Sequence, residues 1–244
     1  MIKSIEKGFT MAECLVTIGV IGVVAAMTLP VMIERFQEVV LRAKWKAVYS
    51  KISNAFLLVK GELSISDYKD LFRSDSEMSE ILTLMRKKLI VEASQYKYIC
   101  EQNSACQGGG GTLKNYKTLF GTKMNSATFS GYADSELSGK IIWRFPDNSV
   151  VYFRQNTYYD MFVIYLFVDV NGVDAPPNTL GKDFFALVLT PKGACPIGAN
   201  CGYRPQYFKN SCNGSREFRA NSLNGMHSGA VVSGIGCSAE ELLK

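Results

Sequence analysis

Three groups of residues in this 244-residue chain are of types that carry out chemistry. The first is a single carboxylate, Glu13, near the start of the apolar segment from Gly8 to Pro30. A charge inside a membrane costs at least a few kcal/mol, so an acidic residue there points to a function. The second group is the cysteines that follow this segment, and the third is an Asp- and Asn-rich loop near residue 175.

The apolar segment has the length of a membrane-spanning helix. Its apolar run extends from Phe9 to Ile33, whereas the apolar core of a secretory signal has about 7 to 15 residues. Length therefore predicts a helix that crosses a membrane. A plain anchor or an uncleaved signal is the alternative, but neither gives a reason for Glu13 or for a glycine directly before the first apolar residue.

The residues around Glu13 form a recognisable motif. A short leader, MIKSIEKG, contains Lys3 and Lys7 and ends in Gly8; Phe9 follows, and Glu13 lies four residues beyond that Phe. This arrangement resembles the N-terminal motif of type IV pilins and pseudopilins, over about the first fifth of the chain. The resemblance implies that a prepilin peptidase cuts after Gly8, that Phe9 is N-methylated, and that Glu13 acts in filament assembly.

Apolar residues continue at helical spacing beyond the membrane-length segment, and Gly61 is a predicted stop. The predicted organisation is a leader at 1–8, a transmembrane half-helix at 9–33, an extracytoplasmic half-helix at 34–61 and a globular domain at 62–244. The family resemblance also assigns flexibility to Gly22 and Pro30, because in assembled pili the helix loses order between a Gly and a Pro in this region.

The cysteines indicate an oxidising compartment. Six of the seven lie beyond the membrane-length segment: Cys100, Cys106, Cys195, Cys201, Cys212 and Cys237. An even number of extracytoplasmic cysteines favours disulfides. The simplest local pairs are Cys100–Cys106 and Cys195–Cys201, which leave Cys212 for Cys237. Zinc is the competing use, but the spacings are not those of a zinc ribbon and His227 is the only histidine.

Basic residues give a conflicting signal about topology. Arg35, Arg42, Lys44 and Lys46 follow the span closely, and counting them would place the C-terminal side inside the cell. The cysteines and the family resemblance favour the opposite orientation. We therefore expect a single-pass protein of the cytoplasmic (inner) membrane, with a cytoplasmic N-terminus and an extracytoplasmic C-terminal part that ends in an extracellular or periplasmic filament.

Strand patterns dominate from residue 140. Residues 141–145 and 150–153 flank a Pro-Asp-Asn turn and predict a hairpin, and two further apolar runs lie at 161–170 and 184–190. A helix is predicted between Ser66 and Glu92, with its apolar face toward the core. The expected fold class is α+β: a long N-terminal helix packed on an antiparallel sheet, with C-terminal loops stapled by disulfides. The pilin family shares this architecture.

The loop between the last two predicted strands reads DVNGVDAPPNTLGKD. It resembles an Asp-x-Asn-Gly turn that many pseudopilins carry before Pro-Asn and Gly-x-Asp. Its oxygen ligands could bind Ca²⁺ through Asp169, Asn171, Asp174 and Asp183. The spacing is not that of an EF-hand, and Asx turns explain the same residues without metal. We therefore expect no cofactor, with calcium as the alternative.

Composition and motifs argue against catalysis and against nucleic-acid binding. The formal charge of +5 comes without a basic run, which makes a nucleic-acid partner a poor expectation. His227 adjoins Ser228, but no nucleophile elbow or metal-binding helix motif accompanies them. A membrane-anchored extracytoplasmic enzyme is thus the less favoured hypothesis.

The expected function is that of a pilin-like structural subunit. The Asp-Asn-Gly loop favours a type II secretion pseudopilus over the alternative, a major or minor subunit of a type IV pilus for adhesion, motility or DNA uptake. The expected partners are other pilin or pseudopilin subunits through the N-terminal helix, the prepilin peptidase, an inner-membrane assembly platform and membrane lipid.

Overall fold

The computed structural model describes residues 10–71, 75–92, 116–123, 142–158, 161–172, 174–201, 211–212 and 233–244. The chain divides into two compact units, Met1–Val40 and Leu41–Lys244. Helix α1, Met11–Glu62, contributes its first half to one unit and its second half to the other. The second half of this helix therefore belongs to the globular unit, together with the sheet.

The first half of α1 is a continuous helix of predominantly apolar residues. Within the described residues, α1 is the helix long and apolar enough to cross a membrane, and none of its most apolar stretch is buried. The helix continues through both Gly22 and Pro30. The loss of order expected between these two residues concerns the assembled filament, and the single chain keeps the helix.

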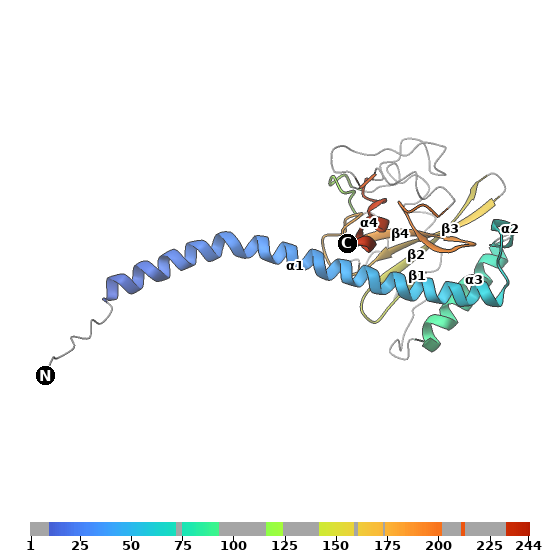
Figure 1. The fold of residues 1–244 in the computed structure, drawn as a ribbon, viewed down its shortest axis with the longest axis horizontal. Coiled ribbons are helices and arrows are strands. Elements are labelled where there is room, and N and C mark those ends of the chain that lie inside the picture. The colour runs from blue at the N-terminus through green and yellow to red at the C-terminus, as the bar shows by residue number, and fades with distance from the viewer. Residues whose placement is uncertain are drawn as a thin grey trace. The chain divides into compact units, whose positions relative to one another are not determined.

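The second unit is built on a five-stranded antiparallel sheet in the order β1-β2-β3-β4-β5 (Figure 1). Its strands are β1 Ile142–Arg144, β2 Val150–Tyr158, β3 Met161–Asp169, β4 Phe184–Thr190 and β5 Gly193–Pro196. Each strand pairs with its sequence neighbour, for example Val151 with Val168 and Phe167 with Ala186. Because β-branched and aromatic residues fit a pleated, half-buried surface, these segments form strands where the sequence predicts them.

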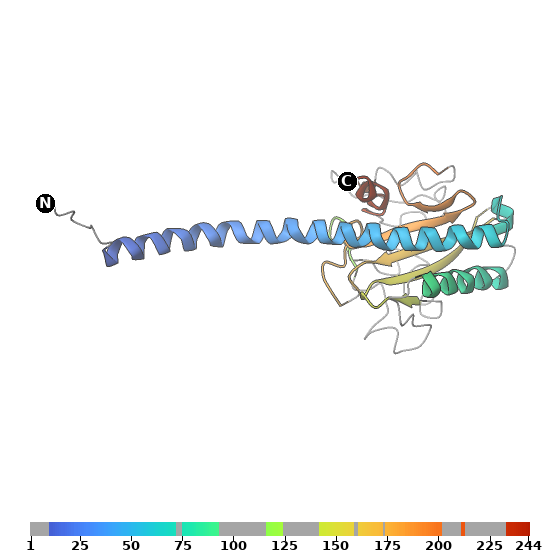
Figure 2. The same cartoon turned by 60° about the horizontal axis from the view of Figure 1, so that its bottom comes forward.

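One face of the sheet packs on the second half of α1. Figure 2 shows this half of α1 and α3 side by side over the sheet. The buried residues of α1 recur every three or four positions and form one stripe: Trp45, Val48, Ile52, Ala55, Phe56 and Val59. They share a single apolar core with the inward-facing residues of β2, β3 and β4. The predicted α+β fold is confirmed.

The region between Ser66 and Glu92 differs from the single predicted helix. It contains two helices, α2 Tyr68–Leu71 and α3 Asp75–Glu92. Asp70 accepts hydrogen bonds from the backbone N–H groups of Ser66 and Asp67 at the start of α2. Such side-chain capping favours a separate short helix over a continuous one. The predicted core-facing side of α3 is confirmed, since its buried residues include Ile81, Leu82, Met85 and Leu89.

Two elements near the C-terminus have no counterpart in the sequence prediction. Strand β5 extends the sheet by pairing Ala194 with Leu189 and Cys195 with Val188. Helix α4, Cys237–Leu243, follows a turn at residues 233–236. The loops of this region are stapled by disulfides, as the sequence predicts.

Candidate functional site

Glu13 closes the N-terminal turn of α1. Its Oε2 accepts hydrogen bonds from the backbone N–H and the hydroxyl of Thr10, both at 2.8 Å. In return, the Thr10 hydroxyl accepts the backbone N–H of Glu13 at 3.3 Å. This is the reciprocal arrangement of a capping box, in which a Thr and a Glu three residues apart satisfy backbone donors at a helix start. The carboxylate thus has a defined orientation before any second subunit is present.

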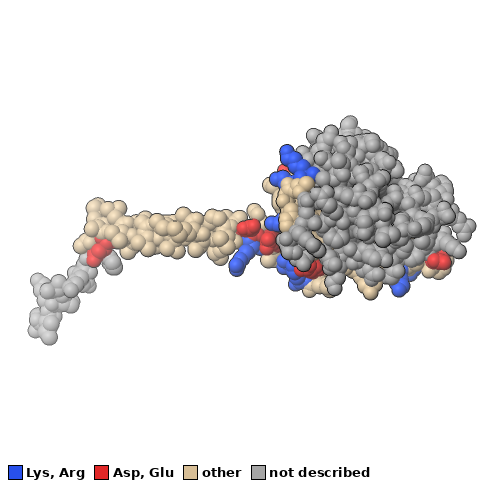
Figure 3. Space-filling view, turned by 90° about the horizontal axis from the view of Figure 1, so that it is seen from above, with Lys and Arg blue, Asp and Glu red and all other residues tan. Residues whose placement is uncertain are grey.

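The residues that follow Glu13 are apolar on every side of the helix. Large hydrophobic side chains remain more than half exposed in this half of α1, among them Leu15, Ile18, Ile21, Met27, Met32 and Phe36. No Asp, Glu, Lys or Arg occurs between Glu13 and Glu34, and Figure 3 shows this part of α1 as a long surface without charged side chains. Such a helix needs lipid or other apolar helices around it.

Gly22 lies at a position of this surface where a side chain would meet no other atom. A Cβ atom built on Gly22 meets no heavy atom within 4 Å, and the same holds for Gly19. Neither glycine is therefore required by packing within the single chain. Gly22 and Pro30 both lie in the exposed apolar half of α1.

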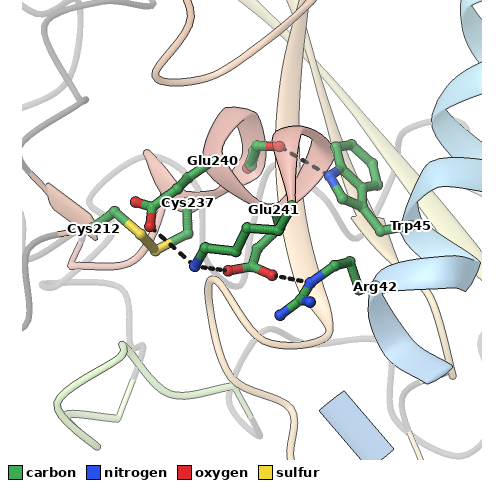
Figure 4. A network of polar contacts seen from close by, with 8 residues as sticks. Arg42, Trp45, Cys212, Cys237, Glu240 and Glu241 are labelled. Carbon is green, nitrogen blue, oxygen red and sulfur yellow. Dashed lines mark hydrogen bonds and ion pairs between the residues drawn. A yellow bond between two sulfur atoms is a disulfide. The ribbon is translucent and has the colours of Figure 1, made fainter. Parts of the chain in front are cut away.

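The C-terminal helix α4 fixes the second half of α1 to the sheet (Figure 4). The Trp45 indole N–H donates to the Ser238 carbonyl at 2.9 Å, and the Trp45 ring stacks on Phe185 with centroids 4.7 Å apart. The Ser238 hydroxyl accepts the backbone N–H of Ala186 in β4 at 2.8 Å. One turn of α4 therefore links α1 to β4 in the interior.

An ion pair completes this contact at the surface. The Arg42 Nε–H donates to Glu241 Oε2 at 2.7 Å, and Lys244 binds Glu240 and Glu241 (Figure 4). Burial raises the pKa of Glu241, but the hydrogen bonds from Lys244 and Arg42 outweigh it and leave that pKa below its usual value. The carboxylate is thus held in its charged, bonded form.

Two disulfides staple the described C-terminal segments. Cys195 pairs with Cys201, and Cys212 pairs with Cys237, which are the simplest pairings of the sequence. Cys237 is the first residue of α4, so its disulfide tethers the helix that binds Trp45. Cys14, in the exposed apolar half of α1, is a free cysteine.

The Asp-rich loop uses its two buried carboxylates to bind its own backbone. Asp169 Oδ1 accepts the N–H groups of Asn171 and Gly172, at 3.1 and 2.7 Å. Its Oδ2 accepts the hydroxyl of Tyr116. These bonds close the start of the loop at the end of β3, where Gly172 has a φ of +89° that favours glycine.

Asp183 closes the other end of the loop in the same way. Its two oxygens accept the N–H groups of Asn178 and Thr179 at 2.7 and 2.6 Å. Burial, with repulsion from Asp169, raises the pKa of Asp183 to about 6 despite these hydrogen bonds. Burial also raises the pKa of Asp169 and that of Tyr116.

The candidate calcium ligands are engaged by the chain's own donors, although Asp169, Asn171 and Asp183 lie close enough to interact with one another. Asp169 and Asp183 are buried and bonded to backbone, Asp174 is exposed, and the Asn171 amide donates to the carbonyls of Ala175 and Pro176. Among the residues that the structure describes, no group of three or more His, Cys, Asp or Glu side chains is arranged to hold a metal ion. The arrangement is that of Asx turns that shape the loop.

Some predicted residues lie outside the described part of the chain. These are Gly8, Phe9, Cys100, Cys106 and His227. Conversely, the structure adds the contacts of Thr10, of Tyr116 and of the Arg42–Glu241 pair, which the sequence did not indicate. The Thr-x-x-Glu spacing of a capping box could have identified Thr10. No local signal marks the other three, because their partners are distant in sequence.

Comparison with known proteins finds a partial match to a fimbrial protein. The chain is 31% identical over 94 residues to "Fimbrial protein EcpC" of Eikenella corrodens, a match that covers 37% of this chain and 54% of the relative. The chain thus spans about half the length of that relative. No family model matches the chain. No solved structure matches it. Part of the chain is therefore similar to a fimbrial protein, in agreement with the general kind of protein that Gly8, Phe9 and Glu13 indicate.

Proposed function

We propose that this chain is a structural, pilin-like subunit that assembles through the first half of α1 into an extracytoplasmic filament. The observation that carries the proposal is the exposed apolar surface of α1 with the single carboxylate Glu13 at its start. Such a helix can reside in a membrane as a monomer and can exchange lipid for neighbouring helices in a filament. The partial similarity to a fimbrial protein supports the same role.

The proposed processing creates the partner of Glu13. Cleavage after Gly8 by a prepilin peptidase leaves a new amine on Phe9, which is then methylated. Glu13 Oε2 is bonded to Thr10, whereas no hydrogen bond within the described residues involves Oε1. The Phe9 amine of a neighbouring subunit can bind this oxygen in apolar surroundings, where the attraction is poorly screened. The pair sets the axial register, since apolar contacts alone differ little when helices slide.

The proposed location is the inner membrane before assembly, with the leader in the cytoplasm and the second unit outside. Disulfides in the second unit fit an oxidising compartment. An inner-membrane platform would transfer the subunit from lipid into the filament. The role needs no cofactor and no catalytic group.

Two filament types are compatible with this role. The Asp-Asn-Gly loop favours a type II secretion pseudopilus, and the similarity to a fimbrial protein supports a surface filament, for which a type IV pilus is the candidate. We propose the pseudopilus as the first candidate and the pilus as the second. Deletion of the gene distinguishes them: loss of exoprotein secretion with surface fibres intact supports the pseudopilus, and loss of surface fibres with secretion intact supports the pilus.

Glu13→Ala is the test of the assembly role, and Glu38→Ala is its matched control, because Glu38 is an exposed acid on the same helix beyond the apolar run. We expect Glu13→Ala to leave membrane insertion, leader cleavage and disulfides intact but to reduce filament incorporation strongly, measured by shearing cells that lack a wild-type copy. Glu38→Ala should assemble normally. Equal incorporation of both variants would contradict the role of Glu13.

Mass spectrometry of the native protein tests the processing step. We expect a mature N-terminus at N-methyl-Phe9, and a bulky residue at Gly8 should leave the leader attached. An assembled form that still begins at Met1 would overturn the proposed maturation.

A further inference from the structure

An open groove lies on the second unit where the second half of α1, strand β5 and helix α4 meet. Its volume is about 860 Å³. Tyr49 lines it from α1, Ala194 and Pro196 line it from β5, and Leu242 and Leu243 line it from α4. All of these residues belong to the second unit, so the groove is a feature of that unit alone.

Contacts within the second unit build the groove before any partner is present. The Tyr49 hydroxyl donates to the Ala194 carbonyl at 3.0 Å and joins α1 to β5. The Ala239 N–H in α4 donates to the Ile197 carbonyl at 3.1 Å. The turn that follows β5 is closed by the disulfide that ends at Cys201. The groove is therefore preformed, as most binding sites are.

Small residues make up much of the lining. They are Ala194, Gly198, Ala199, Gly236 and Ala239. Gly198 has a φ of +101°, and a Cβ atom built on it would overlap the Gly236 carbonyl oxygen, so glycine is required for this close approach. A lining of small residues leaves holes that large side chains of a partner can fill.

The groove carries little charge. Among the described residues that line it, Glu240 is the charged one, and its carboxylate is paired with Lys244 at 3.0 Å. Leu242 is half-buried, and Leu243 at the end of α4 is 89% exposed. Exposed apolar surface of this kind marks a site of interaction with an apolar partner.

The chain itself contains a segment of matching character. The first half of α1 has no Asp, Glu, Lys or Arg between Glu13 and Glu34. Its large side chains are exposed, among them Ile18, Ile21 and Met27. Large side chains on one surface and small residues on the other allow the close packing that well-fitted interfaces show.

The size of the groove agrees with a helix as its occupant. A helix with its side chains is about 10 to 12 Å wide and rises about 1.5 Å per residue. A volume of about 860 Å³ therefore corresponds to about six residues of helix, which is between one and two turns. A single side chain would leave most of this space empty.

We propose that the groove receives the first half of α1 from a second copy of the chain. This inference rests on the proposed function, in which that half of α1 exchanges lipid for other subunits, and it names the surface that the neighbouring subunit offers. The contact is heterologous, because the groove and the helix that fills it are different parts of the chain. Contacts of this type repeat from copy to copy and extend a filament.

Photo-crosslinking in assembled filaments identifies what fills the groove. The variant Leu243→p-benzoylphenylalanine places a photoreactive ketone in the groove, and Thr83→p-benzoylphenylalanine, at an exposed position of α3, is its control. Each variant is expressed together with the wild-type chain, and the sheared filaments are irradiated. A crosslink between two copies doubles the mass of the chain on a denaturing gel. Peptide mass spectrometry of that band then identifies the partner residues.

We expect position 243 to give crosslinked dimers that contain residues 11–33 of the other copy, and position 83 to give none of these. Filaments in which position 243 reacts only with the second unit of a neighbour, with its own chain or with lipid would overturn the inference and leave the proposed function standing. A wild-type chain that forms no filaments would overturn both.

Leu243→Glu provides the second measurement. Because Leu243 is so exposed, thermal unfolding of the second unit should not change. In a filament, however, the new carboxylate would be buried against an apolar helix, so incorporation should fall about tenfold. Thr83→Glu should assemble like the wild-type chain. Equal incorporation of the two variants would overturn the inference, whereas Glu13→Ala tests the proposed function separately.

Discussion

The two halves of α1 place their apolar side chains in opposite environments. In the first half, apolar side chains such as Ile18 and Met27 are exposed all around the helix. In the second half, one stripe from Trp45 to Val59 is buried against the sheet, and the opposite side is exposed. One continuous helix thus combines an amphipathic half, which obtains its stability from its own domain, with an apolar half, which needs lipid or other subunits.

The largest expected effect comes from replacing one large side chain by alanine in each half of α1. Trp45→Ala removes a fully buried ring and its hydrogen bond to Ser238, and should lower the free energy of unfolding of the second unit by about 3 to 5 kcal/mol. Ile18→Ala, at a residue that is 68% exposed, should change it by less than about 0.5 kcal/mol. Pulse proteolysis of the full-length protein in detergent measures both. Similar losses would contradict the division of roles between the two halves.

Cysteine substitutions provide a second comparison between the first half of α1 and the second unit. Cys212 and Cys237 are 25 residues apart, and replacing Cys237 by Ser should cost about 3 kcal/mol through the added freedom of the unfolded chain. Cys14→Ser, in the first half of α1, should leave the stability of the second unit unchanged because Cys14 is free. Thermal unfolding followed by circular dichroism compares the two variants. A destabilised Cys14→Ser variant would show that the two halves are coupled.

Local patterns account for the elements that the sequence predicted. The three- and four-residue spacing of Trp45, Val48 and Ile52 specifies the buried stripe of α1, and β-branched runs specify β3 and β4. Strand β5, by contrast, reads Gly-Ala-Cys-Pro and is a strand only because β4 pairs with it. Helix α4 has seven residues, too few to show a period, and Gly236 before it makes no side-chain cap.

The contacts of the candidate site also differ in whether the sequence alone could predict them. Glu13 and its Thr10 partner are three residues apart, so the sequence alone can predict a capping box. Arg42 and Glu241 are 199 residues apart, and Trp45 and Ser238 are 193 apart. Contacts of this kind arise from the packing of α4 on α1, and no spacing in the sequence encodes them.

The pH dependence of stability tests the Asp-rich loop, which belongs entirely to the second unit. The pKa of Asp183 is raised from 3.8 to about 6, so between these values the folded chain binds a proton that the unfolded chain releases. Stability must therefore rise as the pH falls from 7 to 5, by about 1 kcal/mol for this group. Asp183→Asn should remove most of this slope in urea titrations at the two pH values. A slope that persists in the variant would assign the effect to another group, for example Asp169, whose pKa is also raised.

The smallest expected effect concerns the ion pair that joins α4 to the start of the second half of α1. The Arg42 and Glu241 side chains are 27% and 16% exposed, so solvent screens their attraction only in part. A double-mutant cycle with Arg42→Ala and Glu241→Ala should give a coupling of about 0.5 kcal/mol. The cycle for Lys88 and Glu62, at 35% and 46% exposure, is the control and should give less. Equal couplings would contradict the expectation that the greater burial of the Arg42–Glu241 pair strengthens it.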